Sequence, residues 1–551
     1  MKKNFYLTLF LFLTLPLFGI AQFQRGKIKF TKADSLRGNL TNLRTCYDIS
    51  YYHLDVKFNI DKKYISGNNQ FRFIAVQDFN KLQFDLFANL TIEKIIYHEK
   101  QLSFTRDGDA VFITFPELIK KGDKDEFIVF YSGYPTVTKK APLKGGVVFS
   151  TDSLGKPFVA TACEGTGASV WWPNKDHLYD EVDSMLISIS VPNNLKNVSN
   201  GRLRKVTDLK NGYTRFDWFV NSPINNYNVA ANIGDYKHFS DSYHGEGGKL
   251  TMDYWVLSYN QAKANNQFKE NVKPMLASYE HWAGPYPFYK DGYKLVEVPY
   301  PAMEHQSAIA YGGFQKGFPP NELVGINGGK KWDFIIMHES SHEWFGNSIT
   351  AKDLGDLWIH EGFGTYLTSL FLESQYGKHA AQESIFVSRS GISNDMPVAG
   401  PYHVNQMGSG DMYSKGAVLL NMVRTIIDDD EKWRIILRGM NTRFYHKTVD
   451  YTDIVNYINE QSGKNFSPVF DQYLKYKSLP ILEFIDKDGK LNCRWITEIR
   501  DFNMPVFVRV KGGDYKLIHP SSNFSPIQID GISKENVEVD TFNFYIGLLN
   551  N

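Results

Sequence analysis

The stretch that most restricts the fold of this chain reads Ile336-Met337-His338-Glu339-Ser340-Ser341-His342-Glu343-Trp344. On a helix, side chains at positions i and i+4 share a face, so His338 and His342 can present both imidazoles to one metal ion. Glu339 would lie beside that ion without binding it, where a general base for a bound water is needed. The alternative is a helix surface with two solvated histidines, because so short a pattern also arises by chance.

A second motif supplies a third candidate ligand. Eighteen residues separate His342 from Glu361, which lies in Trp358-Ile359-His360-Glu361-Gly362-Phe363-Gly364 where another helix is expected to begin. Two histidines and one carboxylate with an open fourth position are typical of catalytic zinc sites, whereas structural sites more often use cysteines. Taken alone, Glu361 could simply favour the dipole of its helix. The joint spacing predicts one Zn²⁺ per chain.

The periodicity of apolar and polar residues around these motifs changes twice along the chain. From about residue 45 to 240, apolar and polar residues alternate with period two, as in residues 51–60 and 184–191, which is typical of strands. Helical periodicity begins after residue 260, and strand patterns return near residue 479. These patterns predict a multidomain α+β fold. Helices are expected over residues 261–282, 331–345, 362–376 and 415–427, and late strands over 481–485, 505–510 and 542–546.

The first residues have the pattern of a secretory signal peptide. Lys2 and Lys3 precede an apolar run over residues 5–18, and Gly19-Ile20-Ala21 is the small-x-small pattern of a cleavage site. The run is short for a membrane span, which needs about 20 apolar residues, although a membrane anchor is the alternative. We therefore expect export to the periplasm or the extracellular space, without stable membrane association after cleavage.

Composition excludes some classes of partner. The 551 residues include 61 Lys and Arg against 60 Asp and Glu, a net charge of +1, so a nucleic-acid partner held by a strongly basic surface is not expected. The cysteines, Cys46, Cys163 and Cys493, are far apart and allow at most one disulfide.

Both metal motifs resemble those of the M1 zinc aminopeptidases, gluzincins related to aminopeptidase N and leukotriene A4 hydrolase. His338 and His342 lie in His-Glu-x-x-His-x-Trp-Phe-Gly-Asn, and Glu361 lies in Trp-x-x-Glu-Gly-Phe. The resemblance implies an enzyme that removes the first residue of peptides with a free N-terminus. It also implies a thermolysin-like, mostly helical catalytic domain. The expected segments are a signal peptide (1–21), a β-rich N-terminal domain (22–240), the catalytic domain (241–478) and a small β-sandwich-like C-terminal domain (479–551).

The same resemblance suggests a substrate-binding segment. Pro301-Ala302-Met303-Glu304-His305 is similar to the family signature Gly-x-Met-Glu-Asn. By this resemblance Glu304 binds the α-amine of the substrate, and Ala302 and Met303 are further substrate-binding residues. The chain departs from the signature at Pro301 and His305. Because proline has no N–H, a hydrogen bond to substrate from that position is lost.

Two further segments match the family. Asp411-Met412-Tyr413-Ser414-Lys415-Gly416-Ala417 looks like the segment whose tyrosine stabilises the tetrahedral intermediate. Thr161-Ala162-Cys163-Glu164-Gly165 resembles the N-terminal-domain loop that sends a second group to the substrate amine, although Ala162 stands where a glutamine is usual. The alternatives are an ordinary tyrosine before a helix for Tyr413 and a surface acid for Glu164.

The implied mechanism is hydrolysis by a zinc-activated water, with Glu339 as general base and Tyr413 stabilising the oxyanion. The rival functions are a zinc endopeptidase, which needs no amine anchor, and a non-catalytic peptide-binding protein on the same scaffold. An epoxide hydrolase activity is not suggested by the residues.

Overall fold

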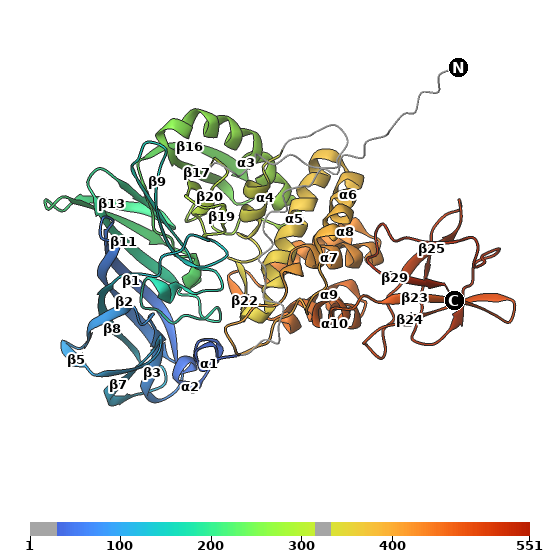
Figure 1. The fold of residues 1–551 in the computed structure, drawn as a ribbon, viewed down its shortest axis with the longest axis horizontal. Helices are drawn as coiled ribbons and strands as arrows, with labels where there is room; N and C mark the ends of the chain where they lie inside the picture. The colour runs from blue at the N-terminus through green and yellow to red at the C-terminus, as the bar shows by residue number, and fades with distance from the viewer. Residues whose placement is uncertain (1–29, 315–331, 551) are drawn as a thin grey trace, which may run out of the picture.

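The structure is a computed structural model that describes residues 30–314 and 332–550, so the expected signal peptide over residues 1–21 lies outside the described residues. A β-rich N-terminal part, a helical middle and a small C-terminal β part follow one another along the long axis (Figure 1). This arrangement confirms the expected fold class. Within the two described ranges, no helix has both the length and the apolar character that a membrane crossing requires.

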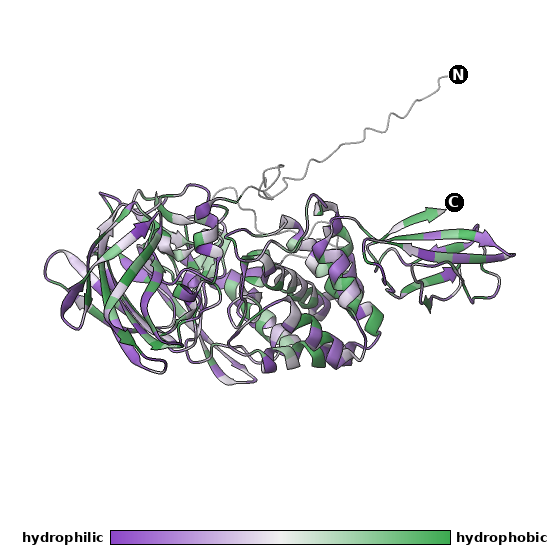
Figure 2. Cartoon of the chain, turned by 90° about the horizontal axis from the view of Figure 1, so that it is seen from below, coloured by the Kyte–Doolittle hydropathy of each residue, from purple (hydrophilic) through white to green (hydrophobic). Residues whose placement is uncertain are grey.

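An eight-stranded sheet forms the frame of the N-terminal part. Its strand β1 pairs antiparallel with β2 and parallel with β11. Buried and partly exposed residues alternate along most of β1, because successive side chains point to opposite faces. The same alternation of hydrophobic and hydrophilic residues is visible along the strands in Figure 2. The elements of this part are α1 (Lys32–Gly38), α2 (Asn42–Thr45), β1 (Tyr47–Asn59), β2 (Tyr64–Ala75), β3 (Phe79–Asp85), β4 (Leu90–Tyr97), β5 (Lys100–Leu102), β6 (Phe104–Asp107), β7 (Ala110–Ile119), β8 (Lys124–Gly133), β9 (Gly146–Thr151), β10 (Pro157–Ala162), β11 (Ser184–Pro192), β12 (Lys196–Val198), β13 (Arg202–Asp208), β14 (Tyr213–Val220) and β15 (Asn232–Gly234).

A five-stranded sheet joins the N-terminal part to the helices. Leu295 and Ile309 belong to the hydrophobic core shared with the helices, whereas their neighbours Val296 and Ala310 belong to the core of the N-terminal part. Both faces of the sheet are therefore buried, one against each part. The expected boundary after residue 240 falls inside the first of its strands. The strands are, in spatial order, β16 (Tyr236–Gly245), β17 (Gly248–Leu257), β18 (Tyr293–Glu297), β20 (Ile309–Tyr311) and β19 (Ala302–Met303).

The helical middle contains the expected helices with shifted ends. The metal-motif helix was expected over residues 331–345, but α4 ends at Ser341, and Gly346, with φ of +139°, lies in the turn that follows. At its start, the Asp333 carboxylate accepts a hydrogen bond of 3.2 Å from the backbone N–H of Ile336. The helices are α3 (Gln261–Ala283), α4 (Phe334–Ser341), α5 (Trp358–Tyr376), α6 (Lys378–Ser388), α7 (Ser414–Ile427), α8 (Asp430–Arg443), α9 (Tyr451–Ser462) and α10 (Ser467–Lys475), with the short strands β21 (Ile349–Ala351) and β22 (Lys447–Val449).

The C-terminal part consists of two small sheets. The expected strand over residues 542–546 is wrong, because the Asp540 carboxylate accepts the backbone N–H of Asn543 at 3.0 Å and turns the chain there. The strand follows directly afterwards and pairs parallel with β23. The three cysteines of the chain are free and buried. The strands are β23 (Ile481–Lys487), β24 (Lys490–Ile496), β25 (Val506–Val510), β26 (Lys516–Ile518), β27 (Ser525–Pro526), β28 (Val537–Val539) and β29 (Gly547–Asn550).

Candidate active site

The two histidines of the metal motif meet at the C-terminal end of α4. His342 is the C-cap residue of this helix, but its backbone keeps helical angles (φ −65°, ψ −19°). The Nε2 atoms of His338 and His342 are 3.3 Å apart, and both residues are buried. The i, i+4 spacing thus brings both imidazoles to one point.

Glu361 reaches the same point from the first turn of α5. Its Oε2 atom lies 3.2 Å from Nε2 of His338 and 3.6 Å from Nε2 of His342. This oxygen is buried and accepts no hydrogen bond from the part of the chain that the structure describes. Because a buried carboxylate needs a compensating charge or donor, this oxygen is suited to a bound cation.

Hydrogen bonding orients the ring of His342, and burial keeps the ring of His338 neutral. Nδ1 of His342 lies 3.0 Å from the carbonyl oxygen of Phe345, so Nδ1 carries the proton and Nε2 keeps its lone pair. Burial lowers the pKa of His338 to about 4, which keeps its ring neutral near pH 7. Two imidazoles and one carboxylate are the donor set of a catalytic zinc site, so these residues fit a zinc ion.

Glu339 lies next to this donor set. One of its oxygens is within 4.8 Å of potential ligand atoms of Glu304 and His342. Burial raises the pKa of Glu339 well above its ordinary value, and the carboxylates of Glu304 and Glu361 raise it further. A carboxyl group in this place can exchange a proton with a molecule bound at the histidines.

Tyr413 approaches the donor set through a close crossing of α5 and α7. A Cβ atom added to Gly362 would lie 3.1 Å from Cα of Gly416, so the two backbones are in contact. The ring of Tyr413, which directly precedes α7, is centred 5.7 Å from the ring of His338. Burial raises the pKa of Glu361, and the neighbouring His342 and then Tyr413 oppose that rise. The crossing therefore brings the side chain of Tyr413 beside the candidate metal ligands.

Glu304 follows the edge strand β19, which contains Ala302 and Met303. The hydroxyl of Tyr227 donates to Oε1 of Glu304 at 3.0 Å. Nδ2 of Asn347 donates to the backbone oxygen of Glu304 at 2.8 Å. Because Tyr227 belongs to the N-terminal part and Asn347 follows the metal motif, both parts of the molecule fix the position of Glu304.

Glu164 comes to the same place from a loop of the N-terminal part. Burial raises its pKa well above the ordinary value, and the carboxylates of Glu304 and then Glu361 raise it further. A carboxylate oxygen of Glu164 lies within 4.8 Å of one of Glu304. Oε1 of Glu164 is nevertheless buried without a partner in the described residues. Two such carboxyl groups form a place that a cation would stabilise.

His360 lies beside these two carboxylates, but its tautomer makes it a donor. The backbone N–H of Ala351 donates to Nε2 of His360 at 2.8 Å, so the proton of the neutral ring is on Nδ1. A potential ligand atom of His360 lies within 4.8 Å of those of Glu164 and Glu304. Since a neutral imidazole has one free lone pair, and Ala351 occupies it, this set is poorer for a metal than the set around His338.

Some residues of the site were not identified from the sequence. Glu343 accepts hydrogen bonds from the hydroxyl of Tyr286 at 2.6 Å and the backbone N–H of Ser307 at 2.9 Å. It thereby ties the metal motif to the loop after Glu304. Its place next to the second histidine of the motif could have marked it. No local pattern marks Tyr227, which only the tertiary fold brings to Glu304.

Comparison with known proteins identifies relatives of this site and fold. Residues 267–473 match the Peptidase family M1 domain. An M1 zinc metallopeptidase from Deinococcus radiodurans, solved as a mutant bound to a Tyr-Ser-Ala substrate, superposes with a TM-score of 0.67. The match covers 79% of this chain and 95% of that chain at 18% identity, and it shows a shared fold.

Two curated relatives match most of the chain at low identity. Tricorn protease-interacting factor F2 of Thermoplasma acidophilum is 22% identical over 514 residues, which is 89% of this chain and 61% of the relative. Leucyl aminopeptidase of Saccharolobus solfataricus is 22% identical over 423 residues, which is 73% of this chain and 50% of the relative. The chain thus spans 50% to 61% of the length of these two relatives.

Proposed function

Because this chain belongs to peptidase family M1 through residues 267–473, we propose that it is an exported zinc aminopeptidase. It would hydrolyse the first peptide bond of peptides with a free N-terminus. The observation that carries this proposal is the pairing of two carboxyl groups, of half-buried Glu164 and buried Glu304, beside the donor set around His338. Such a pair suits an ammonium group, and a peptide offers one only at its N-terminus or on lysine.

In this proposal His338, His342 and Glu361 hold one zinc ion. When bound, zinc supplies Lewis-acid chemistry that lowers the pKa of a water and polarises the scissile carbonyl. The unpartnered Oε2 of Glu361 and the free Nε2 lone pair of His342 support these roles.

Two other side chains would carry out the proton transfer and charge stabilisation. Glu339 accepts a proton from the attacking water and delivers it to the nitrogen of the leaving amine. The Tyr413 hydroxyl donates to the carbonyl oxygen of the substrate as negative charge grows there. The ring of Tyr413, centred 5.7 Å from the ring of His338, supports this role because the side chain already borders the donor set.

Glu304 and Glu164 would bind the α-ammonium of the substrate and so fix the distance from the N-terminus to the scissile bond. Ala302 and Met303 lie on β19, which within the described residues has a partner strand on one side only. An extended peptide can pair with the other side of such an edge strand. This supports a contact between these residues and the substrate backbone, although Pro301 has no N–H to donate.

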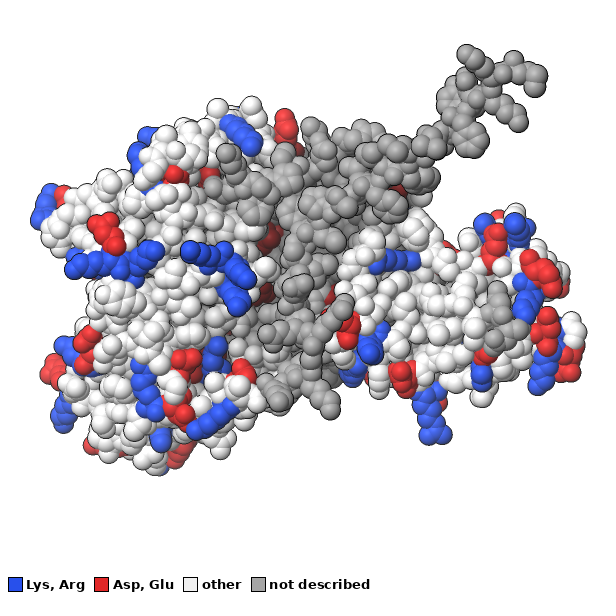
Figure 3. All heavy atoms as spheres, in the orientation of Figure 1, with Lys and Arg blue, Asp and Glu red and all other residues white. Residues whose placement is uncertain are grey.

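The proposal also covers the cellular location and the partners of the protein. The residues 1–21 support export to the periplasm or the extracellular space, with no stable membrane association after cleavage. Peptides are the proposed partners, and nucleic acid is not. On the face drawn in Figure 3, basic and acidic side chains are interspersed over both ends of the molecule, in support of that view.

The test compares a free-amine peptide with its N-acetylated form, with zinc content measured on the same sample. We expect cleavage of the free-amine peptide after its first residue and refusal of the acetylated one. Equal cleavage of both peptides would favour a zinc endopeptidase. Cleavage of neither by the zinc-loaded protein would favour a non-catalytic peptide-binding protein.

A further inference from the structure

The loop that carries Glu164 is a tight turn formed by residues 163–167. The backbone N–H of Gly167 donates to the carbonyl oxygen of Cys163 at 2.7 Å, which closes the turn. Gly165 and Gly167 have φ values of +66° and +91°, a region that favours glycine. The direction of the Glu164 side chain therefore depends on how this turn is held.

The contacts of the Glu164 carboxyl group do not fix its position by themselves. Oε1 is buried without a hydrogen-bond partner in the described residues. A carboxylate oxygen of Glu164 lies within 4.8 Å of one of Glu304, so the charged forms of the two groups repel each other. The loop backbone must therefore be held in place from outside.

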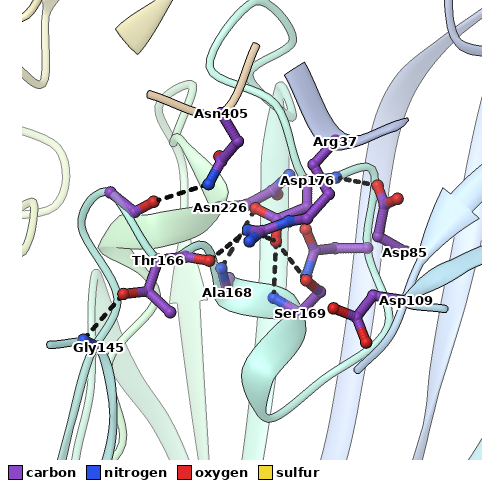
Figure 4. Close-up of polar contacts among 12 residues, drawn as sticks. Arg37, Asp85, Asp109, Gly145, Thr166, Ala168, Ser169, Asp176, Asn226 and Asn405 are labelled. Atoms are coloured by element: carbon purple, nitrogen blue, oxygen red, sulfur yellow. Dashed lines mark hydrogen bonds and ion pairs between the residues drawn. The ribbon is translucent and has the colours of Figure 1, made fainter. Parts of the chain in front are cut away.

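Arg37 of α1 supplies that restraint on one side of the turn. Nη2 of Arg37 donates to the carbonyl oxygen of Thr166 and lies 3.3 Å from Oδ2 of Asp176 (Figure 4). The side chains of Arg37 and Asp176 are 11% and 8% exposed, so water screens their ion pair little. Thr166 is two residues from Glu164.

Asp176 restrains the chain on the other side of Gly167. Its carboxylate accepts the backbone N–H of Ala168 at 3.2 Å and that of Ser169 at 3.1 Å (Figure 4). It also accepts a hydrogen bond from the Ser169 hydroxyl. Arg37 and Asp176 together thus hold the chain immediately before and after Gly167.

The helical middle of the molecule contacts the same turn through Asn405. Its Nδ2 donates to the carbonyl oxygen of Gly165 at 3.3 Å, and its backbone N–H donates to the carbonyl oxygen of Asp34 at 3.0 Å. A Cβ atom added to Gly38 would collide with the backbone of Val404. Helix α1 is therefore packed between the Glu164 turn and the helical middle.

From these contacts we infer that Arg37 is a positioning residue for substrate binding. By its hydrogen bond to Thr166 and its ion pair with Asp176, it holds Glu164 beside Glu304, where the ammonium group of a peptide binds. This inference rests on the proposed function, because it gives Glu164 a role in binding that ammonium group. Arg37 itself touches neither substrate nor metal ligands in this account.

A double-mutant cycle tests the inference on the full chain. Arg37→Ala, Glu164→Ala and the double variant are compared on a peptide with a free N-terminus. We expect Arg37→Ala to raise KM by about tenfold with a smaller effect on kcat, since the loss of a charge-assisted contact is of that order. The double variant should lose no more kcat/KM than Glu164→Ala alone. Arg37→Lys, which keeps the charge, should recover part of the loss.

Control variants distinguish a loss of Glu164 positioning from a general loss of protein stability. Arg215 on β14 is another arginine of the N-terminal part and forms an ion pair with Asp217. Arg215→Ala should leave KM unchanged. Zinc content and the thermal unfolding midpoint are measured for every variant. If Arg37→Ala does not fold, Arg37→Lys and Asp176→Asn take its place in the cycle.

Two results would overturn the inference. Losses for Arg37 and Glu164 that multiply in the double variant would show that Arg37 acts independently of Glu164, with the proposed function intact. An unchanged kcat/KM for Glu164→Ala would remove both this inference and the role of Glu164 in the proposed function.

Discussion

The hydroxyl of Tyr227 donates a hydrogen bond of 3.0 Å to Oε1 of Glu304, and this bond joins the N-terminal part to the catalytic part inside the proposed amine site. Burial raises the pKa of Tyr227 well above its ordinary value, and the Glu304 charge raises it further. The hydroxyl therefore stays protonated and remains a donor at all pH values where the protein would work.

Replacing Tyr227 by phenylalanine should weaken substrate binding. A hydrogen bond to a charged group contributes about 1.5–3 kcal/mol, so we expect kcat/KM on a free-amine peptide to fall about tenfold or more, mainly through KM. Tyr131→Phe is the matched control, because the buried Tyr131 hydroxyl has no hydrogen-bond partner in the described residues. An equal effect of both changes would show that Tyr227 does not act through Glu304.

Removing the charge of Glu304 should weaken binding of the substrate ammonium group and leave zinc binding unchanged. Glu304→Gln keeps an acceptor for Tyr227 but loses the charge, and we expect kcat/KM on free-amine peptides to fall at least about tenfold. Zinc content should stay at that of the wild type, because no proposed ligand is touched. Unchanged kinetics would contradict the assignment of Glu304 to the substrate ammonium.

Glu339→Gln should separate metal binding from chemistry. The proposed ligands remain, while the group that moves the proton is lost, so we expect full zinc content with kcat lowered by about 10²–10⁴. Metal analysis and steady-state kinetics on one preparation give both quantities. Loss of zinc, or turnover near the wild-type rate, would be incompatible with the role of general base.

Tyr413→Phe should lower kcat much more than it raises KM. The hydroxyl is proposed to donate to an oxygen that becomes charged only during the reaction, and losing such a donor costs about 10²–10³ in rate. Kinetics over a range of peptide concentrations separate the two constants. A change confined to KM would mean that Tyr413 only packs against the substrate.

Adding one methyl group at Gly364 should disturb the proposed metal site by displacing the ring of His342. A Cβ atom there would lie 2.9 Å from Oγ of Ser341 and 3.0 Å from Cε1 of His342. We expect Gly364→Ala to lower zinc affinity by about tenfold or more, because small shifts of a ligand ring are costly. Titration with a competing chelator measures the affinity. Gly391→Ala, where the added atom meets open space, should leave it unchanged.

The parts of the site that the sequence predicts are those set by short-range geometry. His338 and His342 are joined by one helical turn, so their spacing alone brings them together. Tyr227 lies 77 residues from Glu304, and no local pattern relates them. Such pairs depend on how two cores pack, which a period in the sequence does not encode.

Errors in the element bounds have a similar origin. The apolar content of residues 542–546 resembles that of a strand, yet the backbone N–H of Asn543 donates to the Asp540 carboxylate and the chain turns first. Residues 331–345 have helical composition throughout, but α4 ends at Ser341, before the turn that contains Gly346. In both places a specific local contact outweighs an average propensity.

The strand β16 limits how the molecule can be divided. Residues 236–245 pair with β17 through their full length, and the hydroxyl of Tyr236 donates to the carbonyl oxygen of Glu297 at 2.7 Å on β18. A fragment that began at residue 241 would lose half of this outer strand and expose the N–H and C=O groups of β17. Open strand edges of this kind recruit other chains. Such a fragment would aggregate, whereas one that began before Tyr236 would keep the strand.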